Sequence, residues 1–114
     1  MEITVHNCII QVAVVTTDER IDVSSAPNLR ERLNALVAEG ASRFVIDLSA
    51  VPFIDSAGMG MLVSLLKHAR IASGEVILVW PTEDGPKKIL QLTKLDRVFP
   101  MADTVGSALR TLTR

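Results

Sequence analysis

The amino-acid sequence predicts an α/β fold in which a small mixed β-sheet has about four helices packed against it. Two β-branched stretches open the chain, in residues 2–17, and helical and strand-like segments then alternate to its end. Strand–helix–strand units with short links form parallel strand pairs through right-handed crossovers. Nearly half of the 114 residues are apolar, which is enough for one core. We therefore expect residues 1–114 to form a single domain.

The first predicted elements are one or two strands and a helix. Residues 2–17, EITVHNCIIQVAVVTT, are rich in β-branched side chains and predict one strand, or two short strands with a break at residues 6–7. Pro27 suits the first turn of a helix, with one of the serines at 24–25 as its cap. Apolar side chains then recur at helical spacing, and Gly40 ends this helix.

The middle of the chain predicts two buried strands around a long helix. RFVIDLS, residues 43–49, and VILVW, residues 76–80, are short apolar runs without polar alternation, which is typical of strands covered on both faces. The helix between them ends near residues 73–74. Its apolar face is formed by Gly58, Met61, Leu62, Leu65, Leu66 and Ala69.

The last third of the chain predicts a helix, a strand and a final helix. Pro86 suits the opening of the first of these helices. The apolar run RVFPM, residues 97–101, predicts the last strand. Thr104 is expected to cap the final helix, which carries apolar side chains at helical spacing.

Composition excludes several classes of protein. A net charge of −1 gives no general attraction to nucleic acid or to an anionic membrane surface. Cys8 is the only cysteine, which excludes an internal disulfide and argues against a zinc cluster, and we interpret it as a small buried hydrophobe. The chain shows no signal peptide and no apolar segment as long as a membrane span. We therefore expect a cytoplasmic protein without membrane insertion, metal or cofactor.

Ser56 is the residue with the clearest functional pattern, in the stretch VPFIDSAGMGMLVSLL. A nucleophilic role is disfavoured because there is no G-x-S-x-G turn, and His68 would lie about 18 Å along the same helix. Two interpretations remain open. Ser56 can cap the helix, or it can accept a phosphate, which would meet free N–H groups and the positive end of the helix dipole. One hydroxyl can serve both roles.

The residues around Ser56 suit the approach of a protein partner. Gly58 and Gly60 remove side chains where a partner's backbone or a kinase could come close. These glycines lack the third glycine or the Gly-Lys-Ser/Thr of nucleotide-binding loops. Met59 and Val63 flank the core face of the helix. They are either partly buried or form an exposed apolar strip for a partner.

The stretch VIDLSAVPFIDSAGMGML, residues 45–62, resembles the signature of the STAS domain, specifically of bacterial anti-sigma factor antagonists. RIDVSSAPNLRERL, residues 20–33, is similar to the entry of the family's first helix. QLTKLDRVFPMADTVGSAL, residues 91–109, is similar to its C-terminal end. The resemblance implies a small mixed sheet with helices and no enzymatic activity.

The resemblance also implies a mechanism of partner switching. The unphosphorylated form would bind an anti-sigma factor that is also a serine kinase of the histidine-kinase-like ATPase type, and so free its target. Phosphorylation of Ser56, beside Asp55, would end binding, and a metal-dependent serine phosphatase would reset the switch. The implied partner-binding residues are Asp22, Ser24, Asp55, Ser56, Ala57, Gly58, Met59, Gly60 and Val63.

Three positions depart from the family pattern. Glu19 stands where a glycine is common, and Ala57 replaces a frequent second hydroxyl. Lys94 replaces a glycine that often ends the third helix, and a left-handed backbone there would cost about 1–2 kcal/mol. An alternative function is that of an accessory subunit of an ABC-type membrane transport system, without a phosphorylation switch. The low net charge and the apolar strip also permit a weak homodimer.

Overall fold

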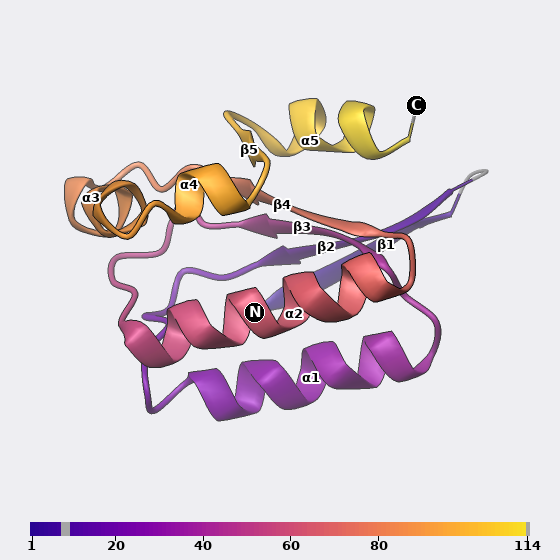
Figure 1. Cartoon of the computed structure of the whole chain (residues 1–114), viewed down its shortest axis with the longest axis horizontal. Helices are drawn as coiled ribbons and strands as arrows, with labels where there is room; N and C mark the ends of the chain where they lie inside the picture. Colours follow the sequence, from indigo (N-terminus) through magenta and orange to yellow (C-terminus); the bar gives the residue numbers. More distant parts are fainter. Residues whose placement is uncertain (8–9, 114) are drawn as a thin grey trace.

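Five strands form one mixed sheet in the computed structural model, which describes residues 1–7 and 10–113 (Figure 1). The strands lie side by side in their order along the chain: β1 (Glu2–Asn7), β2 (Gln11–Thr16), β3 (Arg43–Asp47), β4 (Glu75–Val79) and β5 (Met101–Ala102). β1 and β2 pair antiparallel, and the later neighbours pair parallel. The predicted mixed sheet is confirmed, with two opening strands. β1 continues through the expected break at residues 6–7.

Helices cover both faces of this sheet. α1 (Ala26–Ala38) and α2 (Ser56–Ile71) lie side by side on one face, and α5 (Val105–Leu112) lies on the other (Figure 1). α3 (Asp84–Leu92) and the single turn α4 (Leu95–Val98) follow β4. Among the described residues, no helix is long and apolar enough to cross a membrane. The two helical layers explain why β3 and β4 are apolar on both sides.

Buried side chains form one core on each face of the sheet. On β3, Phe44 and Ile46 belong to the larger core under α1 and α2, whereas Val45 belongs to the smaller core under α5. All three are buried. Successive strand side chains point to opposite faces, so a strand with a core on both sides needs no polar alternation. This arrangement confirms the prediction for residues 43–49.

Several predicted helix boundaries have the expected geometry. Gly40 follows α1 with φ 98°, in the left-handed region that favours glycine. Thr104 caps α5, because its Oγ1 accepts a hydrogen bond of 3.0 Å from the N–H of Ser107. α3 begins at Asp84, two residues before Pro86, which is buried in the first turn.

The strand predicted at residues 97–101 is wrong for most of its length. Arg97 and Val98 belong to α4, and β5 contains only Met101 and Ala102. The reason is the backbone of Lys94, which has φ 60° and starts the α4 turn directly after α3. The departure at Lys94 therefore occupies a left-handed position, at a cost of about 1–2 kcal/mol. Cys8, which we expected to be buried, lies outside the described residues.

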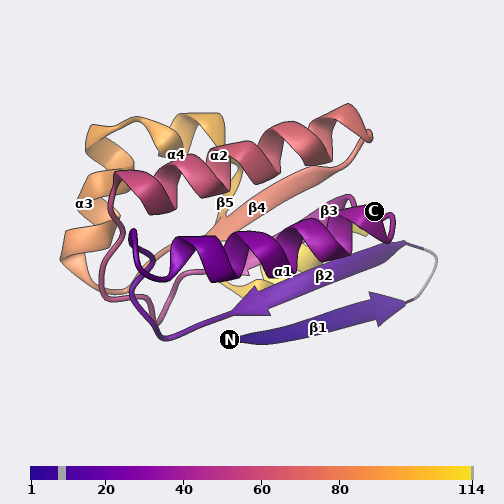
Figure 2. The same cartoon turned by 90° about the horizontal axis from the view of Figure 1, so that it is seen from below.

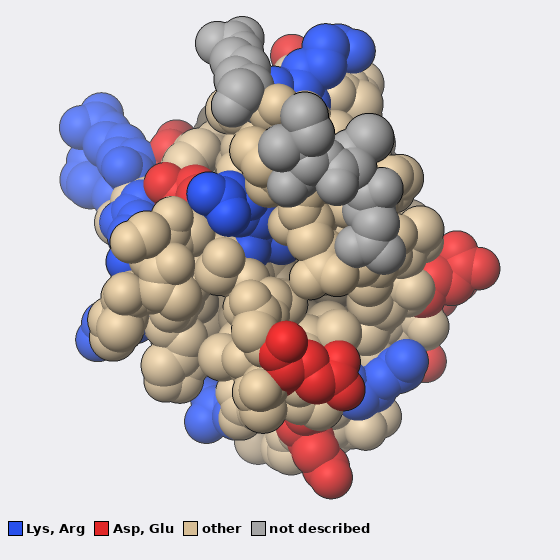
Figure 3. All heavy atoms as spheres, turned by 90° about the vertical axis from the view of Figure 1, so that its right-hand side faces the viewer, with Lys and Arg blue, Asp and Glu red and all other residues tan. Residues whose placement is uncertain are grey.

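Charged side chains do not gather into a single patch on the side of the molecule shown in Figure 3. That view shows lysine, arginine and acidic side chains interspersed around an uncharged centre. Among the described residues, no cluster of three histidine, cysteine or acidic side chains could hold a metal ion. Side-chain hydrogen bonds gather instead in the segments that lead into α1 and α2.

Candidate partner-binding site

The loops that lead into α1 and α2 are joined through their backbones. The N–H of Ile21 donates to the carbonyl oxygen of Phe53 at 2.9 Å, and the N–H of Asp55 donates to that of Ile21 at 3.2 Å. Ile21 and Ile54 form an isolated parallel bridge, and both side chains are buried. The two helices therefore begin from one small, rigid junction at the end of the sheet.

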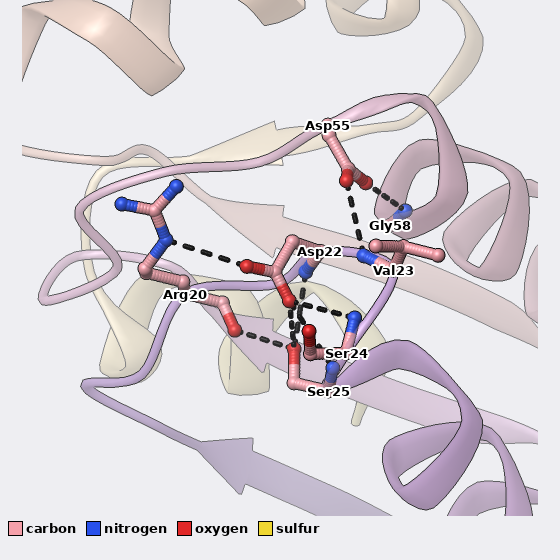
Figure 4. A network of polar contacts seen from close by, with 7 residues as sticks. All are labelled: Arg20, Asp22, Val23, Ser24, Ser25, Asp55 and Gly58. Carbon is pink, nitrogen blue, oxygen red and sulfur yellow. Dashed lines mark hydrogen bonds and ion pairs between the residues drawn. The ribbon is translucent and has the colours of Figure 1, made fainter.

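The Asp55 carboxylate connects this junction to α2 (Figure 4). Asp55 has an extended backbone, and its Oδ1 accepts a hydrogen bond of 2.9 Å from the N–H of Gly58. Its Oδ2 accepts one of 3.0 Å from the N–H of Val23. One side chain thus satisfies a free donor at the start of α2 and a donor of the loop before α1.

The N-cap interpretation of Ser56 is wrong, because Asp55 is the cap and Ser56 is the first residue of α2. Ser56 is exposed, and its hydroxyl has no hydrogen bond to another described residue. The extended backbone of Asp55 directs a carboxylate at the N–H of Gly58, so the neighbouring hydroxyl is not needed there. Ser56 is left free at the positive end of a helix of 16 residues.

Asp22 organises the loop before α1 (Figure 4). Its Oδ1 accepts hydrogen bonds from the N–H groups of Ser24 and Ser25 at 3.0 and 3.1 Å, and its Oδ2 lies 3.3 Å from Arg20 Nε. The hydrogen bond from the N–H of Ser25 is the main cause that lowers the pKa of the Asp22 carboxyl below its ordinary value. The N–H of Ser24 and the side chain of Arg20 also lower this pKa. The carboxylate is therefore engaged within its own loop.

Ser25 occupies the predicted N-cap position of α1, but its hydroxyl does not cap the helix. It donates to the carbonyl oxygen of Arg20 and accepts from the N–H of Asp22. The first turn of α1 uses a backbone acceptor instead, since the N–H of Ala26 donates to the carbonyl oxygen of Asp22 at 2.7 Å. Ser24 is exposed beside this turn.

A groove of about 560 Å³ runs between the first halves of α1 and α2. It is lined by Val23, Ala26, Pro27, Arg30, Glu31, Asn34, Ser56, Ala57 and Gly60. Three predicted partner-binding residues of α2 line the groove. The α1 residues that line it were not predicted from the sequence. Apart from the buried Ala26, helical spacing places those residues away from the buried face of α1, but the sequence carries no signal that this side would border α2. Val23 is 71% exposed at the groove's end.

The other predicted site residues lie outside this groove. Met59 and Val63 are half-buried and pack against the larger core, which favours partial burial over an exposed strip. Gly58 is buried, and a methyl group there would overlap the carbonyl oxygen of Ile21. Asp22 and Ser24 lie in the loop that leads into α1. The predicted residues therefore divide into groove-lining residues, residues of the junction and its loops, and two residues, Met59 and Val63, that pack against the core.

The site offers no partner for a nucleophilic serine. The residues that line the groove include no histidine. His6 lies on β1, and His68 lies in the last turn of α2, whereas Ser56 begins that helix. With no histidine among the described lining residues, the Ser56 hydroxyl lacks the base that most often activates a nucleophilic serine. What the groove offers is an exposed hydroxyl in a mostly uncharged hollow.

We expect the two glycines of α2 to respond in opposite ways to substitution by alanine. Gly58→Ala should lower the free energy of unfolding by about 1–3 kcal/mol, because the new methyl group overlaps the backbone of Ile21. Gly60→Ala should raise it by up to about 1 kcal/mol, because a side chain there meets open space and alanine favours a helix. Urea unfolding of both variants measures the difference. Equal effects would contradict a special role for Gly58.

We expect a graded loss of stability at Asp55. Asp55→Asn keeps one oxygen that can cap Gly58 but loses the hydrogen bond from Val23, which should cost about 1 kcal/mol. Asp55→Ala loses both and should cost about 2–3 kcal/mol. Thermal and urea unfolding measure the series, with Asp103→Asn at an exposed position as the control. An alanine variant as stable as the asparagine variant would show that the cap contributes nothing.

Comparison with known proteins supports one family. The family model described as the STAS domain matches residues 2–108. The anti-sigma-F factor antagonist RsfB of Mycobacterium tuberculosis is 30% identical over 105 residues, which are 86% of this chain and 79% of RsfB. The crystal structure of an anti-sigma factor antagonist from Mycobacterium paratuberculosis is 28% identical, with a TM-score of 0.74 over 99% of this chain and 94% of that one.

A third relative shares the fold at lower identity. The anti-sigma factor antagonist SpoIIAA in its unphosphorylated form has a TM-score of 0.68 at 15% identity, over 99% of this chain and 98% of that one. The phosphorylated form of the Bacillus cell fate determinant SpoIIAA has a TM-score of 0.66 at 18% identity, over 99% of this chain and 100% of that one. Both forms of that protein thus have the fold described above.

Proposed function

The chain belongs to the STAS domain family of anti-sigma factor antagonists, which are non-enzymatic regulators, and we propose that it works as a phosphorylation-controlled partner switch. In this proposal the unphosphorylated protein binds an anti-sigma factor that is also a serine kinase, and so frees the target of that factor. Phosphorylation of Ser56 ends the binding. The observation that carries the proposal is the exposed Ser56 hydroxyl in the wall of the groove between α1 and α2.

The groove suits a protein partner because it is open and poor in charge. Val23, Ala26 and Pro27 contribute apolar surface, and Gly60 has open space where a side chain would be. Among the described residues that line it, Arg30 and Glu31 are the only charged ones, and they carry opposite charges. A partner's backbone can come close at Gly60, and Val23 offers an apolar contact. Uncharged hollows of this kind favour association through burial of apolar area.

A phosphate on Ser56 would oppose that association. It adds a charge of about −1.5 to −2 at neutral pH, next to the carboxylate of Asp55. Covering an unpaired charge with a partner costs several kcal/mol, and each 1.4 kcal/mol is about tenfold in affinity. The N–H of Gly58 already donates to Asp55, so one donor of the helix start is not available to the phosphate. We therefore expect binding to fall well over tenfold.

The same phosphate should leave the fold intact. Ser56 is exposed, and the cap of α2 is Asp55, so phosphorylation removes no hydrogen bond that holds the helix. Repulsion from Asp55 and attraction to the helix start oppose each other, and water screens both. The existence of SpoIIAA structures in both forms supports this part of the proposal. The switch would act on the surface and not on the core.

The phosphorylation and dephosphorylation steps of the proposed cycle also need an exposed Ser56. A kinase of the histidine-kinase-like ATPase type must reach the Ser56 hydroxyl, and a metal-dependent serine phosphatase must reach the phosphate. The first residue of α2 is accessible to both. The protein itself would need no cofactor, because the kinase brings the nucleotide and the phosphatase brings the metal. We place this cycle in the cytoplasm, where ATP is available to the kinase.

We expect the kinase and ATP to add one phosphate, at Ser56, and to weaken binding without unfolding the protein. Mass spectrometry locates the phosphate, calorimetry measures the affinity, and thermal unfolding measures stability. Ser56→Ala should accept no phosphate, whereas the control Ser64→Ala, about two turns further along α2, should accept it normally. A phosphorylated form that binds as tightly as the unmodified one would contradict the switch.

We also expect Gly60→Glu to weaken binding of the unphosphorylated protein at least about tenfold, because it places bulk and charge in the groove. The fold should tolerate it, since a side chain at Gly60 meets open space. Gly85→Glu is a matched control on α3, where a side chain also meets open space. Calorimetry with the kinase measures both variants. Equal affinities would place the interface elsewhere on the molecule.

A further inference from the structure

β1 is the outer strand of the sheet, and its free edge has no lysine, proline or bulge that would prevent pairing with another strand. Figure 2 shows β1 at the border of the sheet, with β2 on one side and no strand or helix beyond it on the other. Its six residues contain no lysine and no proline, and their register with β2 is continuous. The opposite border, β5, is only two residues long. Unprotected edges of this length expose backbone donors and acceptors to another strand.

We infer that β1 pairs antiparallel with β1 of a second copy of this chain, around a two-fold axis at Thr4. This inference does not rest on the proposed function. In that register Thr4 faces the partner's Thr4, and Ile3 faces the partner's Val5. Glu2 faces the partner's His6, so a carboxylate lies opposite an imidazole at both ends of the ladder. Directly opposed side chains on one face of an antiparallel pair are close enough to interact.

The strand sequence selects this register over its neighbours. A two-fold axis perpendicular to the sheet keeps each side chain on its own face, so the register can shift only in steps of two residues. One shift places Glu2 opposite the partner's Thr4, and the other places Thr4 opposite the partner's His6. The first shift shortens the ladder, and both shifts separate the carboxylate from the imidazole. The register centred on Thr4 is the one that matches these two groups.

The side chains on the other face of β1 support the same pairing. Ile3 packs against the larger core, whereas Val5 remains 40% exposed. Val5 borders a small hollow of about 90 Å³ with Ala13 and Leu36. In the proposed dimer the partner's Ile3 lies opposite Val5 and covers apolar surface that one chain leaves open. The larger cores of the two copies would then meet across the axis on the face that carries α1.

The proposed dimer leaves the candidate partner-binding site accessible. No residue of β1 lines the groove that contains Ser56. The proposed dimer surface is also distinct from the apolar strip of Met59 and Val63 on α2. A dimer through β1 and a dimer through the groove therefore make different predictions for substitutions at Thr4 and at Gly60.

Light scattering of the full chain over a range of concentrations tests the inference. The mass should rise from 12.4 kDa toward twice that value as the protein concentration increases to about 1 mM. Thr4→Lys places two like charges on the axis and should raise the dissociation constant at least about tenfold. Gln91→Lys adds the same charge at an exposed position of α3 and should have no effect. Circular dichroism verifies that each variant is folded.

A charge exchange tests the register itself. Glu2→Lys should weaken the dimer, and adding His6→Glu should restore it, because opposite charges again face each other between the copies. Within one strand these two residues are about 13 Å apart, so the rescue reports contact between chains. A protein that stays monomeric at every concentration would overturn the inference. So would a dimer that resists Thr4→Lys but is lost in Gly60→Glu.

Discussion

The Asp55 carboxylate is the interaction on which the arrangement of the site depends. Its two oxygens hold the N–H of Gly58 at the start of α2 and the N–H of Val23 before α1. Backbone hydrogen bonds between Ile21 and residues 53–55 join the same two segments. Because both helices start from this junction, their first halves are held parallel and close. The groove between them is a consequence of that constraint.

The division of roles between Asp55 and Ser56 explains how the proposed phosphorylation site can lie at the start of a helix without capping it. Helix starts need an acceptor for their free N–H groups, and Asp55 supplies it. Ser56 is thereby released from a structural role while it stays near the positive end of the helix. Gly58 belongs to the structural side of this division, because α2 approaches the backbone of Ile21 there. Gly60 belongs to the accessible side.

The groove and the free edge of β1 lie in different parts of the molecule. The buried strands β3 and β4 of the sheet have a core on each face, and the candidate site lies in the helix starts and loops around it. The groove lies where α1 and α2 begin, and the free edge of β1 lies along the border of the sheet. The proposed partner at the groove and the proposed second copy at the edge would therefore occupy separate surfaces.

Features that depend on neighbours in the chain were determined by the sequence alone: the helix end at Gly40, the cap at Thr104, the doubly buried strand predicted at residues 43–49 and the motif around Ser56. The tertiary structure decided which residue caps α2 and why Gly58 must be small. It also decided that α1 lines the groove, because these features depend on contacts such as that of Val23 with Asp55, 32 residues away. Local spacing can predict a helix, but only tertiary packing decides which face of that helix lies beside another helix.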